Sequence, residues 1–432
     1  MHPTVSRPEA PRAPLLVLAL LAGGACAGGD GARDGRAAGE AGTAPAAVDT
    51  VDGVPRLSYG EARAPALGWG FDTLAVIGGF ASEGSAQQFD QVHPGGLAGD
   101  ERDNLYVLDA AGQRVLGFGP GGEALGTWGR EGGGPGELAQ PGGLAIGPGD
   151  SLWVADRANR RVTIYPPDPG GGAGSVALTE DVAGLGGRLV ARTDGLYGVA
   201  ILFTFRPGDE PDLPPLRLLR IERDASGAGR VADTLWTAPA QPFDQVELRS
   251  GSSVMMMMMQ RTFSPQFWWE PLPDGGFAVT DSADYVIRLL GPDGAERLRI
   301  ERAPLARAAT EADRERARER AREQGETAAN PTVRQMTEQR IEKMTFAERI
   351  PRVTGLAVDG RGRLWVGVSE ERAGESGRID VYEPATGALL GEIRDPAFFP
   401  ALFYGDGRAA VLDRDDLDVQ RITVVALRDA AG

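Results

Sequence analysis

The sequence is poor in the side chains that most metal and redox sites use. Its 432 residues include one cysteine, Cys26, and two histidines, of which only His93 lies beyond the N-terminal region. One thiol cannot form an intramolecular disulfide or a cysteine metal cluster. One histidine cannot build a multi-histidine zinc site. No G-x-S-x-G motif is present either, so no catalytic or metal-binding residues are expected from these patterns.

Lysine is scarce as well, and acidic residues outnumber basic ones. The formal net charge is −16, the only lysine is Lys343, and all other cationic side chains except the histidines are arginines. Proteins that bind nucleic acids usually present a basic surface to the phosphates. We therefore expect no nucleic-acid partner and an acidic, well solvated surface.

Glycine and proline are abundant instead. The chain contains 62 glycines and 31 prolines, and 42% of its residues are hydrophobic. This composition supplies a large core but disfavours a mainly helical protein, whereas many short strands separated by turns accommodate it. A single all-β unit can reach this length.

The N-terminus has the pattern of a bacterial export signal over residues 1–26. Arg7 and Arg12 precede the apolar run from Leu15 to Ala22, and small residues follow up to Cys26. The run is too short to span a bilayer permanently. Cys26 at its end resembles a lipoprotein lipobox, which implies that the thiol carries a lipid anchor. The alternative is cleavage at the A-x-A pattern of residues 25–27, which would release a soluble periplasmic protein.

Residues 27–55 follow this signal and contain almost no large apolar side chains. Such a segment cannot bury enough surface to offset its ordering entropy. We predict a disordered tether between the envelope and a folded domain over residues 56–430, with membrane contact only through the lipid anchor. The predicted location is the periplasm or the outer membrane.

The domain begins with an internal repeat. Residues 94–118 and 141–165 align without a gap, 47 residues apart, with 12 of 25 positions identical. Each copy reads as short strands separated by polar turns, and the first copy is followed by a fourth strand at 123–129. Four short antiparallel strands in a repeat of this length are typical of a propeller blade.

Weaker copies follow at residues 188–237, 267–301, 353–394 and 399–427. The last copy has only three strands, and residues 71–78 can supply the missing fourth strand from the N-terminal side. The sequence thus predicts an all-β, six-bladed β-propeller of four-stranded antiparallel blades, closed by this N-terminal strand, which removes two exposed sheet edges.

The repeat carries a family resemblance. The pattern P-x-G-[LI]-A, followed by [LI]-[YW]-V-x-D-x-x-[GN]-x-R-V, resembles the NHL repeat, and the whole chain is similar to exported bacterial six-bladed propellers. The resemblance implies the fold, whereas function must be argued from the site. Some six-bladed propellers are enzymes that use metal-bound histidines, or a calcium ion held by carboxylates and amides.

One helical insertion is predicted between the fourth and fifth blades, over residues 303–350. Thr310 and Asp313 form a weak capping box, and glutamate–arginine pairs at helical spacing follow. Ala312, Ala317 and Ala321 give only a narrow apolar line. We expect an exposed helix that is interrupted at Pro331 and lies over one face of the ring, or an arm that docks a partner.

Five consecutive methionines, residues 255–259, precede the fourth blade. Thioethers can bind copper(I), but strand geometry would place three of them on one face and two on the other. We expect a strand packed on both sides, paired in a hairpin with residues 243–249.

Several residues are candidates for ligand binding. His93 precedes the first blade and is expected in a turn at the rim. Arg114 and Arg161 recur at one blade position, which favours a structural ion pair over ligand binding. Trp268 and Trp269 could stack on a sugar, but adjacent strand residues point to opposite faces, so at most one can face a given ligand.

The carboxylates of Asp109, Asp156, Asp281 and Asp413 fall at strand ends. There they most often accept backbone N–H groups of the following turn, although calcium could use them. We expect a non-catalytic, monomeric binding or scaffold module that recognises a protein, peptide or glycan through one face of the ring, without a cofactor. The alternative is a calcium-dependent hydrolase or lyase with a carboxylate-lined channel. A third possibility is an interaction protein that works through the helical insertion.

Overall fold

The computed structural model describes residues 43–79, 88–200, 214–250, 253–326, 331–369, 376–394, 396–415 and 419–428. The predicted signal peptide, Cys26 and residues 27–42 of the predicted tether lie outside these ranges. Within them, no helix combines the length and the apolar composition needed to cross a bilayer.

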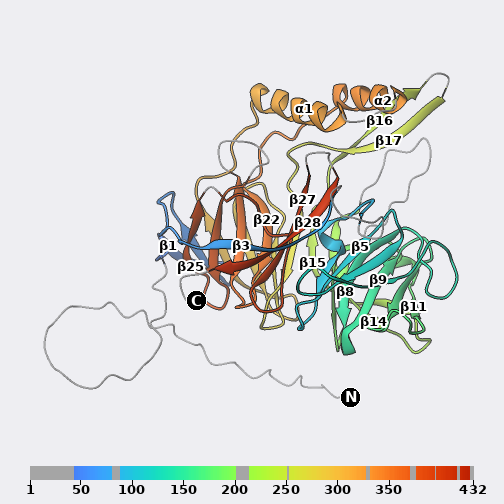
Figure 1. Ribbon diagram of the computed structural model, residues 1–432. Coiled ribbons are helices and arrows are strands. Elements are labelled where there is room, and N and C mark those ends of the chain that lie inside the picture. The colour runs from blue at the N-terminus through green and yellow to red at the C-terminus, as the bar shows by residue number, and fades with distance from the viewer. Residues whose placement is uncertain are drawn as a thin grey trace, which may run out of the picture. The chain divides into compact units, whose positions relative to one another are not determined.

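Six antiparallel blades follow one another along the chain, as predicted (Figure 1). The first blade contains β4 (Leu97–Gly99), β5 (Leu105–Asp109), β6 (Arg114–Phe118) and β7 (Ala124–Trp128), and the second contains β8 (Pro141–Gly147), β9 (Ser151–Asp156), β10 (Arg161–Tyr165) and β11 (Gly174–Ala177). The third contains β12 (Leu185–Arg192), β13 (Gly195–Ala200), β14 (Leu216–Arg223) and β15 (Gly229–Ala238), and the fourth contains β18 (Trp268–Pro271), β19 (Phe277–Thr280), β20 (Val286–Leu290) and β21 (Glu296–Arg302). The fifth contains β22 (Val353–Val358), β23 (Leu364–Ser369), β24 (Ser376–Glu383) and β25 (Ala388–Arg394), and the sixth contains β26 (Leu402–Tyr404), β27 (Arg408–Arg414), β28 (Gln420–Arg428) and β3 (Gly70–Gly78). Single 3-10 turns are formed by Pro94–Gly96, Pro148–Asp150 and Glu180–Val182.

The ring closes as the sequence predicted. The last blade has three strands of its own, β26 to β28, and β3 pairs antiparallel with β28 as its fourth strand. Because β3 precedes the first blade in the chain, the last sheet joins both ends of the repeat array. Neither end of the array is left with an incomplete blade.

The core is divided among the six junctions between neighbouring blades, each of which contains one buried apolar cluster. One cluster joins the last blade to the first, with Ile422 packed in the same group as Leu105. Middle strands such as β5 are buried at every position, whereas the outer strand β7 is largely exposed. Strands packed on both faces need no alternation of apolar and polar residues, so β5 reads LYVLD.

The inner strands approach one another closely at the start of the repeats. A Cβ atom at Gly95 would lie 2.3 Å from the carbonyl carbon of Gly187, and one at Gly143 would lie 2.4 Å from the Gly187 oxygen. Both glycines belong to the repeated P-G-G sequence. Gly95 is the second and Gly143 the third residue of that sequence, and at each of them the close backbone approach leaves no space for a side chain.

The end of the predicted tether is ordered, which corrects the expectation of disorder up to residue 55. β1 (Ala47–Val51) and β2 (Val54–Tyr59) form a hairpin, and β2 pairs in parallel with β21, the outer strand of the fourth blade. β1 stays largely exposed, so its order comes from main-chain pairing on an open sheet edge and not from apolar burial.

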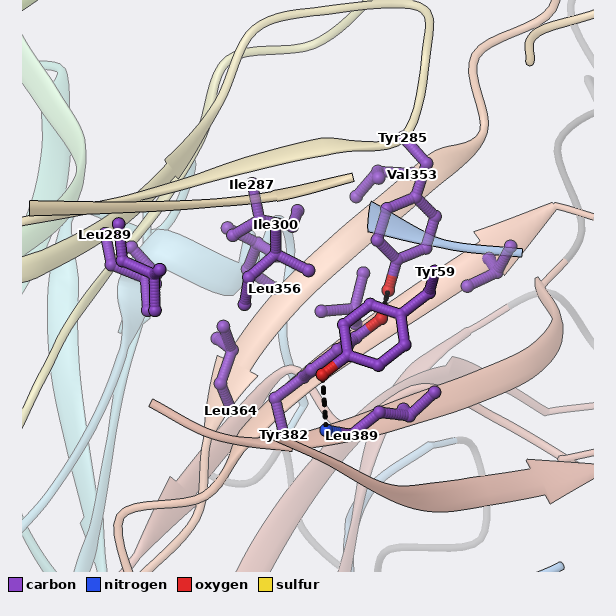
Figure 2. Packing of buried hydrophobic residues seen from close by; sticks show 14 of the residues in the cluster. Tyr59, Tyr285, Ile287, Leu289, Ile300, Val353, Leu356, Leu364, Tyr382 and Leu389 are labelled. Carbon is purple, nitrogen blue, oxygen red and sulfur yellow. Dashed lines mark hydrogen bonds between the residues drawn. The ribbon is translucent and has the colours of Figure 1, made fainter. Parts of the chain in front are cut away.

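Tyr59 at the end of β2 fixes this hairpin to the fifth blade. Its hydroxyl donates to the Gly387 carbonyl at 2.8 Å and accepts from the Leu389 N–H at 3.1 Å. Figure 2 shows Tyr59 beside Tyr382 and Leu389 of the fifth blade and Tyr285 of the fourth. The segment before β3 therefore joins two blades.

Two insertions leave the ring on the same face. Between the third and fourth blades, β16 (Phe243–Ser250) and β17 (Ser253–Gln260) form a two-stranded hairpin. The predicted helical insertion between the fourth and fifth blades contains α1 (Glu311–Glu326) and α2 (Pro331–Glu342). Both start after the fourth strand of a blade, where antiparallel strands return the chain to one face, and α2 contacts β16 (Figure 1). We call the hairpin and the two helices the arm, and this side of the ring the arm face.

The methionine run forms β17 in the predicted hairpin, with Met255 opposite Leu248 and Met259 opposite Asp244. The expectation that it packs on both sides is wrong. Met255 and Met256 point to opposite faces of the strand and are both exposed, because the hairpin belongs to the arm and not to a blade.

Candidate functional site

A pocket of about 460 Å³ lies on the arm face, between α1 and the starts of the inner strands β18 and β22. Its lining residues are Thr262, Phe263, Ser264, Gln266, Trp268, Ala317, Arg320, Ala321, Met344, Ile350, Pro351, Val353 and Thr354. Most of these side chains are apolar, and a few polar groups stand among them. This composition is usual for a site that binds an organic ligand.

The floor of the pocket is a loop held in a strained conformation. Thr262 pairs with the segment after α2, donating its N–H to the Thr345 carbonyl at 2.9 Å and accepting from the Ala347 N–H at 2.8 Å. The next residue, Phe263, has a φ of 68°, in the left-handed region that bulky side chains rarely enter. Its ring lies 5.6 Å from the ring of Phe346. Such strain persists only where the surroundings enforce it, and it is common at ligand sites.

Two polar atoms of the pocket have no hydrogen-bond partner among the described residues. The hydroxyl of Ser264 is buried in a residue that is 4% exposed, and it has no hydrogen-bond partner among the described residues. The indole nitrogen of Trp268 is likewise buried and unpartnered in that part of the chain. A buried polar group without a partner costs about 1–3 kcal/mol. A bound carbonyl or hydroxyl group would remove that cost.

The roof of the pocket is α1, which contributes Ala317, Arg320 and Ala321. Its first turn is anchored by Asp313, which receives hydrogen bonds from Arg307 at 2.6 and 2.8 Å and from the Thr310 hydroxyl at 2.6 Å. The Arg307 guanidinium holds the pKa of Asp313 well below its usual range. Thr310 also accepts from the Asp313 N–H at 3.3 Å, so the predicted capping box is present.

A buried glutamate beside a partly exposed arginine lies two residues further along β18. Glu270 is on the same face of the strand as Trp268, since alternate strand residues share a face. It lies 2.8 Å from Arg188 of the inner strand β12. Burial raises the pKa of Glu270 to about 7, against the opposing effect of Arg188. The inner strands therefore carry a carboxyl group that titrates near neutral pH.

The structure separates the two candidate tryptophans, as expected from their adjacent positions. Trp268 lines the pocket, whereas Trp269 is buried with Tyr197 and Phe277 between the third and fourth blades. His93 is exposed just before Pro94–Gly96 and does not line the pocket. Of the five binding candidates, Trp268 is the one that lines this pocket.

The candidate arginines form ion pairs within their blades. Arg114 contacts Asp109 at 3.2 Å, and Arg161 contacts Asp156 at 2.8 Å. Arg161 also donates to the carbonyls of Gly134 and Glu137. The structural pairing expected from the repeat therefore holds, because each arginine binds the aspartate that ends the preceding strand.

The repeated aspartates at strand ends accept donors from the protein. Asp109 receives the N–H groups of Asp90 and Gln91, and Asp156 receives that of Ala139. Asp281 pairs with Arg288 and Asp413 with Arg421. In the described ranges, no group of three or more His, Cys, Asp or Glu side chains is placed to hold a metal ion.

Sequence reasoning missed most of the pocket. Ser264, Phe263 and Arg320 belong to no repeat, and their sequence neighbours show no binding motif. They meet because two insertions that are distant in the sequence leave the ring on one face. The only available signals were the adjacent tryptophans and the placement of both insertions beside the fourth blade.

Comparison with known proteins agrees with the repeat. Residues 138–165 match the family described as NHL repeat, and this range covers the loop before β8 and the strands β8 to β10. The predicted resemblance is thus confirmed at the second blade. No curated protein matches the sequence.

Several solved structures align with most of this chain at low sequence identity. A protein of Bacteroides fragilis described as exported is 11% identical, with 87% of this chain and 99% of that chain covered and a TM-score of 0.45. A gluconolactonase of Xanthomonas campestris is 16% identical over 85% and 99% of the two chains, with a TM-score of 0.38. A virginiamycin B lyase of Staphylococcus aureus is 9% identical over 83% and 99%, with a TM-score of 0.38.

Proposed function

We propose that the protein is a non-catalytic binding module of the bacterial cell envelope that holds a ligand on the arm face of its propeller. The observation that carries this proposal is the buried, unpartnered hydroxyl of Ser264 in the wall of the pocket beneath α1. A polar atom in this position is stabilised when a ligand supplies its hydrogen-bond partner.

The ligand class follows from the walls of the pocket. Phe263, Trp268, Met344, Ile350 and Val353 offer an apolar surface, which suits an aliphatic or aromatic group. The Ser264 hydroxyl and the Trp268 indole N–H can both donate to a carbonyl oxygen. Of the protein, peptide and glycan ligands considered, a peptide segment that combines an apolar side chain with backbone carbonyls fits best.

The location follows from the N-terminal sequence. The predicted export signal of residues 1–26 would direct the mature chain out of the cytoplasm, and Cys26 would carry a lipid that fixes it to the membrane. Replacing Cys26 by alanine should move the protein from the membrane fraction to the soluble fraction of the periplasm. Unchanged fractionation would contradict the lipid anchor but would leave the pocket unaffected.

The pocket is tested with peptides selected on the wild-type protein from a random display library. The affinity of a labelled peptide is then measured for Ala321→Trp, which fills the pocket from α1, and for Ala312→Trp, which adds the same side chain at an exposed position of the same helix. We expect Ala321→Trp to weaken binding at least about tenfold and Ala312→Trp to leave it unchanged. Equal affinity for both variants would contradict the proposed site.

A further inference from the structure

Strand β17 of the arm is unusual for a strand outside the blades. Its eight residues, SVMMMMMQ, contain no charge, no proline and no glycine, and β16 is its only strand partner among the described residues. Edge strands of soluble proteins are normally protected by charged side chains, proline or a covering element. β17 has the composition of a strand that pairs readily with another strand.

The other edge of this hairpin is covered by α2. Gln339 donates to the Arg249 carbonyl and accepts from the Arg249 N–H, both at 2.8 Å, and Lys343 donates to the Glu247 carbonyl. The backbone groups of Arg249 and Glu247 therefore point away from β17. This protection is absent on the β17 side, because no strand among the described residues pairs with that edge between Val254 and Met258.

The register shows which groups of β17 are open. Arg249 lies opposite Val254, Glu247 opposite Met256, and Gln245 opposite Met258. In an antiparallel pair, residues opposite one another point their N–H and C=O groups either both inward or both outward. Val254, Met256 and Met258 therefore direct theirs away from β16. The same edge is occupied further along, where Thr262 pairs with Thr345 and Ala347.

The side chains leave this edge accessible. Val254, Met255 and Met256 are 56%, 41% and 49% exposed, although they are apolar and the chain as a whole is strongly charged. Exposed apolar groups on an open strand edge favour addition of a further strand, whose backbone supplies the missing partners.

We propose that β17 pairs antiparallel with β17 of a second copy of this chain, so that two hairpins form one four-stranded sheet. A two-fold axis at Met256 places the outward groups of Val254 opposite those of Met258, and Met256 opposite its own counterpart. Every residue in this pairing is uncharged, so the net charge of −16 creates no like-charge contact along the strands. The chain then forms a dimer through the arm, instead of the monomer expected from the sequence.

Proline substitution tests this pairing with little effect on the hairpin itself. Met256→Pro and Met258→Pro each remove an N–H that faces away from β16, and the proline ring blocks the open edge. Met256→Leu and Met258→Leu keep the backbone donor and the apolar side chain. All variants are made in the lipid-free Cys26→Ala chain and examined by sedimentation velocity over about two orders of magnitude in concentration.

We expect the Cys26→Ala parent and both leucine variants to form dimers, and both proline variants to sediment as monomers at every concentration. Thermal unfolding checks that the proline variants are folded. If they are not, Met256→Lys places a charge on the same edge and is expected to give monomers. A monomeric parent, or a dimer that persists in the proline and lysine variants, would overturn the proposal. Ala321→Trp should still dimerise, which separates this test from that of the pocket.

Discussion

Arg302 at the end of β21 lies 2.5 Å from Asp380 on β24, and this buried ion pair joins the fourth blade to the fifth. Arg302 also lies 3.3 Å from Glu392 on β25. Each carboxylate has a second arginine within its own blade, Arg378 at 2.9 Å from Asp380 and Arg394 at 2.7 Å from Glu392. The insertion that follows β21 therefore begins beside a residue that belongs to the fourth blade and is bound to the fifth.

Replacing Arg302 by methionine should strongly destabilise the fold. The substitution keeps much of the side-chain length but leaves Asp380 and Glu392 without the cation they share. Removing one partner of a buried ion pair typically costs about 3–5 kcal/mol. The free energy of unfolding from urea denaturation at neutral pH measures this loss.

Arg299→Met is the matched control, because Arg299 precedes Arg302 on the same strand but pairs with Glu296 at 2.7 Å within its own blade. That pair is more exposed, and we expect a loss of at most about 1 kcal/mol. Equal losses in the two variants would contradict the role assigned to the junction between the blades.

The contribution of the repeated aspartate to the free energy of unfolding should differ from blade to blade. Asp156 is fully buried and binds Arg161, whereas Asp413 and Arg421 are 36% and 37% exposed. Asp156→Ala removes the carboxylate that neutralises the partly buried Arg161 guanidinium and that accepts the Ala139 N–H, so we expect a loss of about 3–5 kcal/mol. Asp413→Ala should cost less than about 1 kcal/mol. Urea denaturation of the two variants gives the comparison, and similar losses would show that burial does not set the cost.

Most of the fold could be predicted because each blade is formed by one continuous stretch of the repeat. The P-G-G sequence, the buried strand that ends in aspartate and the following arginine each correspond to one part of a blade. The closing strand β3 was predictable because the last repeat lacks one strand. Order in β1 was not predictable, since its residues are exposed and its partner β2 is held by the edge of β21, which is distant in the sequence.

The site was less predictable because it too is formed by segments that are distant in the sequence. Trp268 was a candidate because a tryptophan ring can stack on a ligand, but nothing near Ser264 in the sequence indicates that α1 covers it. The strain at Phe263 depends on pairing between Thr262 and the segment after α2. Contacts between two insertions leave no periodic pattern in either of them.

Tyr59 provides a test of the hairpin that precedes the ring. Tyr59→Phe removes a donor to the Gly387 carbonyl and an acceptor for the Leu389 N–H, both in the fifth blade. Leaving these buried groups unpaired should lower the free energy of unfolding by about 1–3 kcal/mol. Amide hydrogen exchange at Leu389 should become faster, and unchanged exchange there would show that β2 does not secure the fifth blade.

Glu270 should make stability depend on pH in a direction opposite to that of an ordinary surface carboxylate. Burial raises its pKa in the folded protein to about 7, compared with 4.5 for an ordinary glutamate. Between these values the folded state keeps a proton that the unfolded state releases. As the pH rises from about 4.5 to about 7, this group therefore lowers the free energy of unfolding by about 3 kcal/mol. Above that range the contribution of this group does not change further.

Glu270→Gln isolates this contribution because glutamine keeps the shape but does not titrate. Urea denaturation of both proteins at several pH values between about 4.5 and about 8 should show a steeper decline for the wild type than for the variant. The difference between the two curves should stop changing above about pH 7. Parallel curves across the whole range would mean that the carboxyl beside Arg188 is ionised throughout and that burial does not raise its pKa.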